Sequence, residues 1–356
     1  MIIGLNTLFL IPNEVGGSEY YTRSTINNLL KVDKKNHYIL FCNKENIETF
    51  RFKTTSITKV LVPINAKNRF VRIFTENLIF PLIVKKYNCK ILHSFGYSSP
   101  LWGKFKKLIT IYDLNWKDHP EDNSIITNMV LNYLISNSIK KADRIVTTSN
   151  FSKNRLIKYF PKFRNKVIVI RAVIDNKFLK ILSTKLNPPM SKKYILCVSA
   201  FYPHKMIIYL IKLWKKFTKT NKNLTLVIIG QHGKDQSLIE KQIATIDNIK
   251  WFKKISLKEL VAFYKYSKLV IQPSVYEGFG YPVYEAIACG KNVLVGKKEL
   301  YHSSILEHLN KLSFNIVKDV KLLKSLSNNR KPIKTDMYNQ NDLLSTKKII
   351  NLYSNI

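Results

Sequence analysis

Glu277 and Glu285 are two glutamates eight positions apart, and such a pair of carboxylates is a candidate for ligand binding or catalysis. The backbone N–H groups of Phe279, Gly280 and Tyr281 lie between them, at the expected start of a helix. Such N–H groups have no partner within the helix, so they suit an anion or a ligand rich in hydroxyl groups. A plainer interpretation is that Glu285 only complements the helix dipole and that Glu277 is solvated.

The residues around the two glutamates predict one strand–helix–strand step of a parallel sheet. Residues 269–271 are apolar, and Pro273 soon stops the strand that they form. Pro282 suits the first turn of a helix, and Gly290 suits its left-handed end. The first glutamate then lies in a loop and the second in the first helical turn. Both are expected at the carboxyl edge of the sheet, where open α/β sheets bind ligands.

The stretch from Pro273 to Gly290 resembles the donor-binding signature of the retaining glycosyltransferases of family 4, the glycosyl transferases group 1. In that family two glutamates stand eight positions apart in a Glu-Gly-Phe-Gly-x-Pro-x-x-Glu-Ala context. The resemblance implies that Glu277 lies beside the donor sugar and that Glu285 holds the ribose hydroxyls of the nucleotide. It also assigns the segment between them to the sugar hydroxyls and the phosphate; the candidates are Phe279, Gly280, Tyr281 and Pro282.

A glycine pair, Gly16 and Gly17, stands between the expected first strand, residues 2–10, and a helix over residues 18–30. Glycine lets the backbone approach a diphosphate closely at the start of a helix. The pair matches the Gly-Gly of the first loop in the same family. The resemblance therefore assigns both residues to donor binding.

Lys205 follows the first strand of the second predicted domain, where the family has a lysine that neutralises the donor diphosphate. The resemblance assigns Ser199 and His204 to donor binding as well. The positions where the family often has an accompanying arginine hold Ala200 and His204, so one phosphate charge is unaccounted for. A protonated His204 and another cation, such as Arg171, are the alternatives.

Tyr112 and Asp113 follow another short apolar strand, where the family commonly has His-Asp with the histidine near the donor sugar. This chain has Tyr112 in place of that histidine, so the role of the histidine is unassigned. His119 is the alternative residue for it, on the acceptor side. A lone histidine in a loop is, however, more often a surface residue. Asp113 remains a candidate to orient or deprotonate an acceptor hydroxyl. The predicted catalytic residues are thus Glu277, Asp113 and Lys205.

The chain has 356 residues, more than one ordinary core accommodates, and it shows two runs of alternating strands and helices. We therefore predict the α/β class, with two Rossmann-like parallel-sheet domains facing a central cleft, which is the GT-B architecture of the family. The acceptor-side domain is expected over residues 1–180 and the donor domain over 190–338, with a linker near 175–192. A last helix over about 340–356 is expected to pack back on the first domain, as the family implies.

Lys and Arg outnumber Asp and Glu by 59 to 23, a formal net charge of +36. Residues 51–107 hold 12 of these basic residues against one acidic residue, Glu76. Such a field favours an anionic membrane, a polyanionic saccharide or a nucleic acid, whereas a lysine-rich bias would give only a solvated surface. Residues 69–107, with an apolar and basic helix over 69–87, are our candidate for docking on anionic lipid. An ordinary core-packed helix is the alternative.

The sequence has no apolar run of the ~18 residues that a membrane span needs, and its start resembles a strand more than a signal peptide. Its 4 cysteines and 7 histidines show no metal-ligand or redox spacing, and no Asp-x-Asp occurs. We therefore expect a metal-independent enzyme without a cofactor, cytoplasmic or peripheral on the inner face of the cell membrane. The resemblance adds a nucleotide-diphosphate sugar as co-substrate.

With the resemblance, these residues predict transfer of a sugar from a nucleotide-diphosphate donor to an acceptor hydroxyl with retained configuration. The family implies a hexosyltransferase with a saccharide or lipid-linked acceptor, in surface polysaccharide or lipopolysaccharide biosynthesis. Two alternatives stay open: a catalytically impaired member, because of Tyr112 and the missing arginine, and a sugar-nucleotide epimerase or phosphorylase-like enzyme of the same architecture. No nucleic-acid-binding motif occurs, so no nucleic-acid partner is expected.

Overall fold

The computed structural model describes residues 1–328 and 341–356, and these residues form two compact units. The first unit comprises residues 1–117, 125–173 and the C-terminal segment from 341, and the second comprises residues 118–124 and 174–328. The chain passes from the first unit to the second between residues 173 and 174, before the boundary predicted at residue 180. Residues 118–124 group with the second unit although both flanking segments belong to the first.

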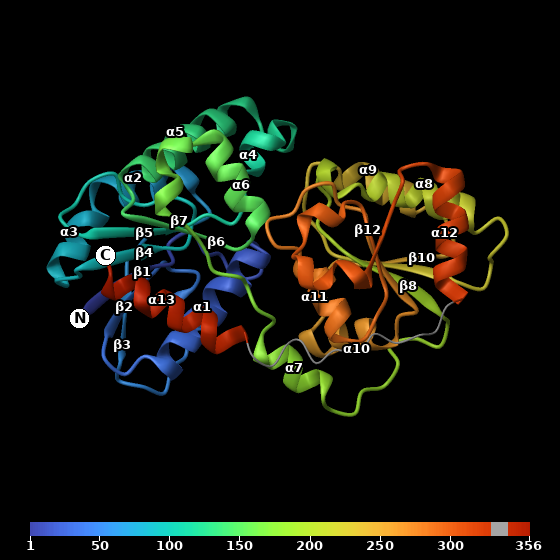
Figure 1. Cartoon of the computed structure of the whole chain (residues 1–356), viewed down its shortest axis with the longest axis horizontal. Helices are drawn as coiled ribbons and strands as arrows, with labels where there is room; N and C mark the ends of the chain where they lie inside the picture. The colour runs from blue at the N-terminus through green and yellow to red at the C-terminus, as the bar shows by residue number, and fades with distance from the viewer. Residues whose placement is uncertain (329–340) are drawn as a thin grey trace. The chain divides into compact units, whose positions relative to one another are not determined.

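The first unit is a doubly wound α/β unit on a parallel sheet of seven strands, in the order β3-β2-β1-β4-β5-β6-β7 (Figure 1). Its central strands are continuous apolar runs because helices cover both faces of the sheet. The strands are β1 (Ile2–Asn6), β2 (His37–Cys42), β3 (Ile57–Leu61), β4 (Ile91–Ser94), β5 (Lys106–Thr110), β6 (Arg144–Thr147) and β7 (Val167–Val169).

The helices of the first unit lie on the faces that right-handed crossovers require. In Figure 1, α1 (Gly17–Val32) and α13 (Asn341–Ser354) pack side by side on one face, and α5 (Ile125–Lys141) and α6 (Asn150–Tyr159) cover the other. The ring of His93 in β4 anchors α13, because its Nδ1 lies 2.7 Å from the hydroxyl of Tyr353. Within the described residues, no helix has the length and apolar character needed to cross a bilayer.

The long amphipathic helix predicted after β3 is interrupted, so that prediction is wrong in its extent. The structure has α2 (Arg69–Leu78) and then α3 (Phe80–Lys86). Pro81 explains the break, because it has no N–H to donate to the carbonyl of Asn77 one turn earlier. The indole N–H of Trp102 donates to that carbonyl instead.

The apolar face of α2 is not part of a core, which corrects the core-packed alternative. Phe70 and Phe74 are 78% and 60% exposed, and Leu78 and Leu82 are exposed as well. The helical spacing indicates an apolar face, but the spacing alone does not show what covers that face.

The second unit repeats the plan with a six-stranded parallel sheet in the order β10-β9-β8-β11-β12-β13. Its helices are α7 (Asn176–Leu182), α8 (Ile207–Phe217), α9 (Gln236–Ile243), α10 (Leu257–Tyr266), α11 (Tyr281–Ala288) and α12 (Ile316–Asn328). The segment of α7 lies in the predicted linker near 175–192, but this helix packs on α10. The strands are β8 (Tyr194–Val198), β9 (Thr225–Ile229), β10 (Ile249–Phe252), β11 (Leu269–Gln272), β12 (Val293–Val295) and β13 (Leu309–Lys311).

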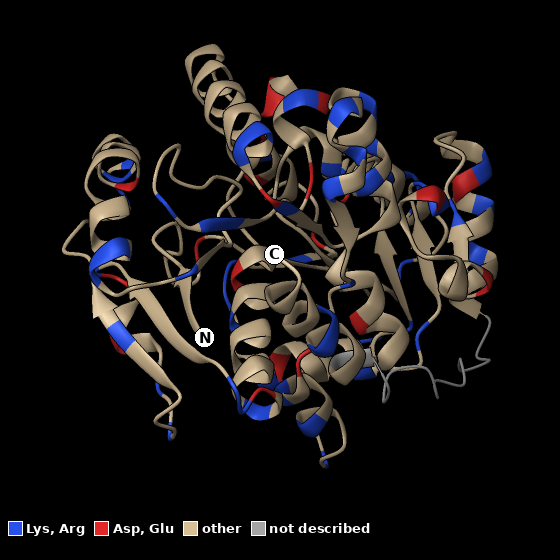
Figure 2. Cartoon of the chain, turned by 60° about the vertical axis from the view of Figure 1, so that its left-hand side comes forward, with Lys and Arg blue, Asp and Glu red and all other residues tan. Residues whose placement is uncertain are grey.

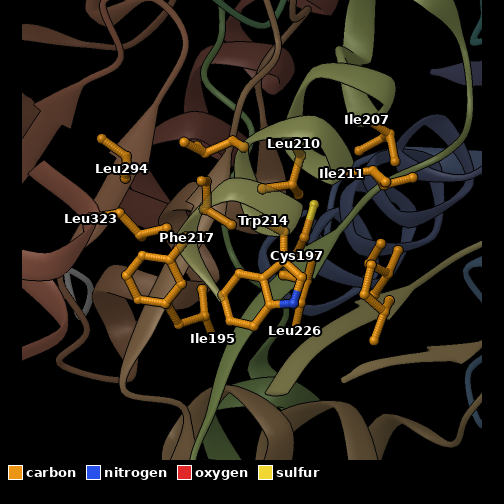
Figure 3. Close-up of a cluster of buried hydrophobic side chains, with 14 of the residues drawn as sticks. Ile195, Cys197, Ile207, Leu210, Ile211, Trp214, Phe217, Leu226, Leu294 and Leu323 are labelled. Atoms are coloured by element: carbon orange, nitrogen blue, oxygen red, sulfur yellow. The ribbon is translucent and has the colours of Figure 1, made fainter. Parts of the chain in front are cut away.

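A buried apolar cluster fixes α8 on the sheet of the second unit (Figure 3). Leu210, Trp214 and Phe217 recur at helical spacing and face Ile195 of β8 and Leu226 of β9. The Trp214 side chain is fully buried, and its indole N–H donates to the Asn248 side chain at 3.1 Å. This packing joins α8 to β8, and the chain that leaves the carboxyl end of β8 carries one of the predicted site residues, Lys205.

Candidate active site

A buried ion pair joins two of the predicted catalytic residues. The Nζ of Lys205 lies 2.8 Å from Oε2 of Glu277, and the two side chains are 17% and 8% exposed. Lys205 follows β8 and Glu277 follows β11, which are adjacent parallel strands, so both residues lie at one carboxyl edge. Burial alone would raise the pKa of Glu277, but the Lys205 ammonium holds that pKa below its ordinary value. Glu277 is therefore a buried, ionised carboxylate and not a solvated one.

Gln272, the last residue of β11, orients this carboxylate. Its Nε2 donates to Oγ of Ser274 at 3.2 Å and to Oε1 of Glu277 at 3.5 Å. The sequence analysis does not identify Gln272. The available signal was a polar residue at the end of an otherwise apolar buried strand.

Glu285 lies in the second turn of α11, not in the first turn as predicted. Its side chain is 7% exposed, so it is not a surface complement to the helix dipole. Burial raises the pKa of Glu285 to about 7, and the neighbouring Tyr264 side chain offsets only part of this rise. When ionised, this carboxylate can accept hydrogen bonds from a pair of hydroxyl groups.

The loop before α11 presents backbone donors. Gly280 has a φ of 82°, and a Cβ there would lie 2.7 Å from a ring carbon of Tyr301, so a side chain would be strained and would clash. Within residues 1–328 and 341–356, the N–H groups of Phe279 and Gly280 have no hydrogen-bond partner. Tyr281 and Pro282 begin the helix. The loop can therefore donate two hydrogen bonds to an anion or a hydroxyl group.

Tyr301 is a further residue of this site that the sequence analysis does not identify. Its ring covers Gly280, and its hydroxyl is buried with no hydrogen-bond partner among the described residues. Burial, followed by the charge of Glu277, raises the pKa of this hydroxyl well above its ordinary value. Tyr301 is therefore a neutral side chain beside the ionised Glu277.

His204 and Lys205 lie in a short 3₁₀ turn, Pro203–Lys205, and α8 begins only at Ile207. The predicted helix from Pro203 is interrupted because Met206 adopts a left-handed conformation with φ of 56°. The carbonyl of His204 accepts the N–H of Val275 at 2.9 Å, which ties the turn to the loop after β11. Ser199, at the end of β8, donates its hydroxyl to the carbonyl of Ala200 at 2.9 Å.

The structure places His119 with the donor-side residues of the second unit. Its ring centroid lies 5.4 Å from that of His204 and 5.1 Å from that of Tyr276. From the sequence, His119 is predicted beside Tyr112 on the acceptor side. The structure groups it instead with the turn that carries Lys205.

The first unit brings the glycine loop and Tyr112 to the same helix. Gly16 caps α1 with a φ of 57°, a conformation that favours glycine, and Gly17 is the first helical residue. The hydroxyl of Tyr112 lies 3.1 Å from Oγ1 of Thr22 in the same helix. Burial raises the pKa of Tyr112 well above its ordinary value, so its hydroxyl is neutral.

The carboxylate of Asp113 is held by two hydrogen bonds at the end of β5. The hydroxyl of Tyr97 donates to Oδ2 at 3.2 Å, and the N–H of Asn115 donates to Oδ1 at 3.1 Å. These bonds fix the orientation of the carboxylate. Tyr97, which contacts both Tyr112 and Asp113, is not predicted from the sequence.

Two family models match adjacent segments of this chain. The model described as Glycosyltransferase Family 4 matches residues 15–178, and the model described as Glycosyl transferases group 1 matches residues 180–328. The first segment contains Gly16 and Asp113, and the second contains Lys205, Glu277 and Glu285. The chain belongs to the glycosyl transferases of group 1.

This glycosyltransferase is 25% identical over 232 residues to the O-antigen chain mannosyltransferase RfbU of Salmonella typhimurium. That alignment covers 65% of this chain and 62% of the relative, so the chain matches less than two thirds of the relative's length. A second relative, the O-antigen chain mannosyltransferase B of Escherichia coli, is 21% identical over 53% of this chain and 52% of its own length.

Solved structures show that this glycosyltransferase has the GT-B fold. Anabaena HepE in complex with UDP and glucose has a TM-score of 0.66 at 14% identity, with 100% of this chain and 99% of that chain covered.

Proposed function

We propose that this glycosyltransferase moves a hexose from a nucleotide-diphosphate sugar to an acceptor hydroxyl, with retained anomeric configuration and without a metal. The observation that carries the proposal is the buried pair of Lys205 and Glu277 at one carboxyl edge, with Glu285 on the helix that follows. The O-antigen chain mannosyltransferase relatives support a hexose and a saccharide acceptor in surface polysaccharide assembly.

In the proposed reaction, the bond between the anomeric carbon and the diphosphate oxygen breaks, and its electron pair leaves with the diphosphate. The acceptor oxygen forms the new bond to the anomeric carbon and gives up its proton. Lys205 and the N–H groups of Phe279 and Gly280 stabilise the negative charge that develops on the leaving group. Glu277 orients the sugar, and Glu285 binds the ribose hydroxyls.

We also propose binding roles for three residues of the first unit. The loop of Gly16 and Gly17 allows the backbone to approach the diphosphate, since neither residue has a side chain there. Asp113, oriented by hydrogen bonds from Tyr97 and Asn115, orients the acceptor hydroxyl or accepts its proton. Tyr112 has no acid–base role in the proposal, because its buried hydroxyl stays neutral.

The test is a screen of the full chain against UDP-, GDP- and dTDP-sugars, with release of the nucleoside diphosphate as the readout. The proposal expects release with one donor class, accelerated by a saccharide or lipid-linked acceptor. Binding without release indicates a catalytically impaired member. Conversion of one nucleotide sugar into an epimer indicates the epimerase alternative, and no binding of any donor contradicts the proposal.

We also propose that an exposed apolar surface of the first unit docks on an anionic bilayer at the cytoplasmic face. This docking surface consists of the exposed apolar side chains of α2, of α5 and of the 99–102 loop, which contacts both helices. On α2, Phe70, Phe74 and Leu78 recur one turn apart and are 50% exposed or more. Phenylalanine and leucine of this kind suit the boundary between lipid headgroups and acyl chains. The exposed members on α5 are Ile125, Ile126, Met129 and Tyr133.

The 99–102 loop connects the two halves of the docking surface. The indole N–H of Trp102, itself 44% exposed, donates to α2 at Asn77, and Lys141 of α5 donates to the carbonyl of Leu101 at 2.7 Å. Ser138 of α5 donates to the carbonyl of Ser99 at 3.2 Å. The exposed apolar side chains of α2, Trp102 and α5 therefore form connected parts of one surface.

The charge around the docking surface selects anionic lipid. The one acidic residue of 51–107, Glu76, is buried, so the exposed formal charges of that stretch are all positive. Lys and Arg are spread over many elements in Figure 2, but α2 and α5 each carry four exposed large apolar side chains. The exposed basic residues beside the surface are Arg69, Lys85, Lys86, Lys104 and Lys106.

The combined Phe70→Asp and Phe74→Asp variant is expected to lose binding to phosphatidylglycerol vesicles in a flotation assay. Each substitution exchanges an exposed apolar ring for a charge that anionic lipid repels, and folding changes little because both rings are exposed. Leu238→Asp, an exposed apolar position of the second unit, is the control and should float like the wild type. Equal binding of wild type to phosphatidylcholine vesicles, or unchanged binding of the double variant, would contradict the docking proposal.

A further inference from the structure

The first unit has a group of polar side chains at the point where its strand order reverses. The chain continues from β1 to β2 and β3 on one side of the sheet and then crosses to β4 on the other side, so this point lies between β1 and β4. Open parallel sheets bind ligands outside the carboxyl ends of their strands at such a point. The last residues of the two strands, Asn6 and Ser94, are polar and buried, and the Asn6 amide donates to the Ser94 hydroxyl at 3.4 Å.

Glu76 of α2 reaches these strand ends. Its side chain is 8% exposed, and its Oε1 accepts a hydrogen bond from Nδ2 of Asn6 at 3.5 Å. The N–H of Leu8 donates to Oδ1 of Asn6 at 3.0 Å, which leaves the amide nitrogen to face Glu76. Among the described residues, this long bond is the only hydrogen bond to the Glu76 carboxyl group. Burial raises the pKa of Glu76, and the charge of Arg72 and the bond from Asn6 offset only part of this rise.

Arg72 lies one turn before Glu76, on the same face of α2. Its Nε is buried without a hydrogen-bond partner, and no described residue forms an ion pair with its guanidinium group. The Arg72 charge acts on the pKa of Glu76, but within the described part of the chain the two side chains do not form an ion pair. Buried polar groups without partners cost free energy, so this pair has unused hydrogen-bonding capacity for a ligand.

The pair suits a hydroxyl group better than an ion. An ionised carboxylate only accepts hydrogen bonds and a guanidinium only donates them, whereas a hydroxyl group does both. A negatively charged ligand is repelled by Glu76, and a positively charged one is repelled by Arg72. A neutral ligand with neighbouring hydroxyl groups, which is the chemistry of a saccharide, can satisfy both side chains at once.

We infer that Glu76 and Arg72 bind hydroxyl groups of the acceptor saccharide at the carboxyl edge of the first unit, where Asn6 orients Glu76. This inference rests on the proposed function and deepens it by naming residues that bind the acceptor. Phe70 and Phe74 of the docking surface each lie two positions before one of the pair, about 200° around the helix. One face of α2 therefore contacts lipid, and the opposite face binds saccharide.

The test is a titration of the full chain with the methyl α-glycosides of mannose, glucose, galactose and N-acetylglucosamine, followed by saturation-transfer difference NMR. The wild type is expected to bind at least one of them. Glu76→Gln and Arg72→Gln should each weaken that binding about tenfold, the value of one hydrogen bond to a charged group. Glu48→Gln and Arg51→Gln remove exposed charges of the same unit, so these matched controls should bind like the wild type.

The two variants test the site independently of each other. Glutamine keeps the shape of Glu76 and can still accept the bond from Asn6, and Arg72 is only partly buried, so both variants are expected to fold and to bind UDP and GDP like the wild type. Unchanged glycoside affinity in both variants, or a wild type that binds none of the glycosides, would overturn the inference. Nucleotide binding that persists in that case leaves the proposed function standing. If the wild type binds a glycoside through Glu76 and Arg72 but binds neither UDP nor GDP, the proposed function fails alone.

Discussion

Lys205→Ala is expected to lower kcat for sugar transfer about 10²–10³-fold, the usual effect of removing one aimed electrostatic group from a transition state. Lys205 is 17% exposed on its side chain and pairs with Glu277 at 2.8 Å, so water replaces its charge poorly. The measurement is steady-state release of the nucleoside diphosphate from the donor identified by the screen. Lys253→Ala is the matched control: it removes an exposed lysine that pairs with Glu240 at 3.4 Å in the same unit, and its kcat should stay at the wild-type value.

A loss of activity in Lys205→Ala has to be separated from a loss of folding. The substitution leaves Glu277 buried without its cation, which costs roughly 3–5 kcal/mol of unfolding free energy. The double variant of Lys205→Met and Glu277→Gln removes both charges, so it should recover most of that stability and remain inactive. An active double variant would show that the pair only stabilises the fold.

Glu285→Gln is expected to stabilise the protein against unfolding at high pH while it weakens donor binding. Burial raises the pKa of Glu285 from 4.5 to about 7, so between these values the unfolded chain releases a proton that the folded chain keeps. Wild-type stability therefore falls as pH rises through this window. Glutamine cannot ionise, so its advantage should grow from near zero at about pH 4 to about 3 kcal/mol at about pH 8.

The measurement for Glu285→Gln is urea unfolding at several pH values, together with nucleotide affinity. Glutamine has one acceptor oxygen where the carboxylate has two, so the ribose hydroxyls lose a hydrogen bond. Glu307→Gln, at a carboxylate of the same unit that is 77% exposed, should show neither effect. A stability difference that does not change with pH would contradict the burial of an ionisable group at this position.

The Lys205–Glu277 pair is the part of the site that the sequence predicts best, for a physical reason. Both residues follow apolar strands, and in a doubly wound parallel sheet the carboxyl ends of all strands meet at one edge. The first strand of a unit is central, so the residues after β8 and β11 become neighbours. The position of glycines such as Gly280 can be predicted equally well, because a left-handed backbone conformation restricts the residue type.

Residues whose roles depend on tertiary packing were not predictable. Asp122 and His119 lie in a polar loop between β5 and α5, and no local pattern shows that this loop leaves one unit to pack on the other. The exposure of Phe70 and Phe74 was equally hidden, because an apolar helical face looks the same whether a core, a partner or a lipid covers it. The short strand β13 has a mixed sequence, Leu-Asn-Lys, that carries no strand signal.

Calorimetric titration of wild type, Lys205→Ala and Lys253→Ala with UDP and with GDP tests the central claim most directly. The claim is that Lys205, paired with Glu277, is the diphosphate-binding cation of a nucleotide-sugar site. It predicts saturable binding of at least one nucleoside diphosphate to the wild type and to Lys253→Ala, with affinity lowered about tenfold or more in Lys205→Ala. Equal affinity in all three proteins, or no binding to the wild type, would contradict it.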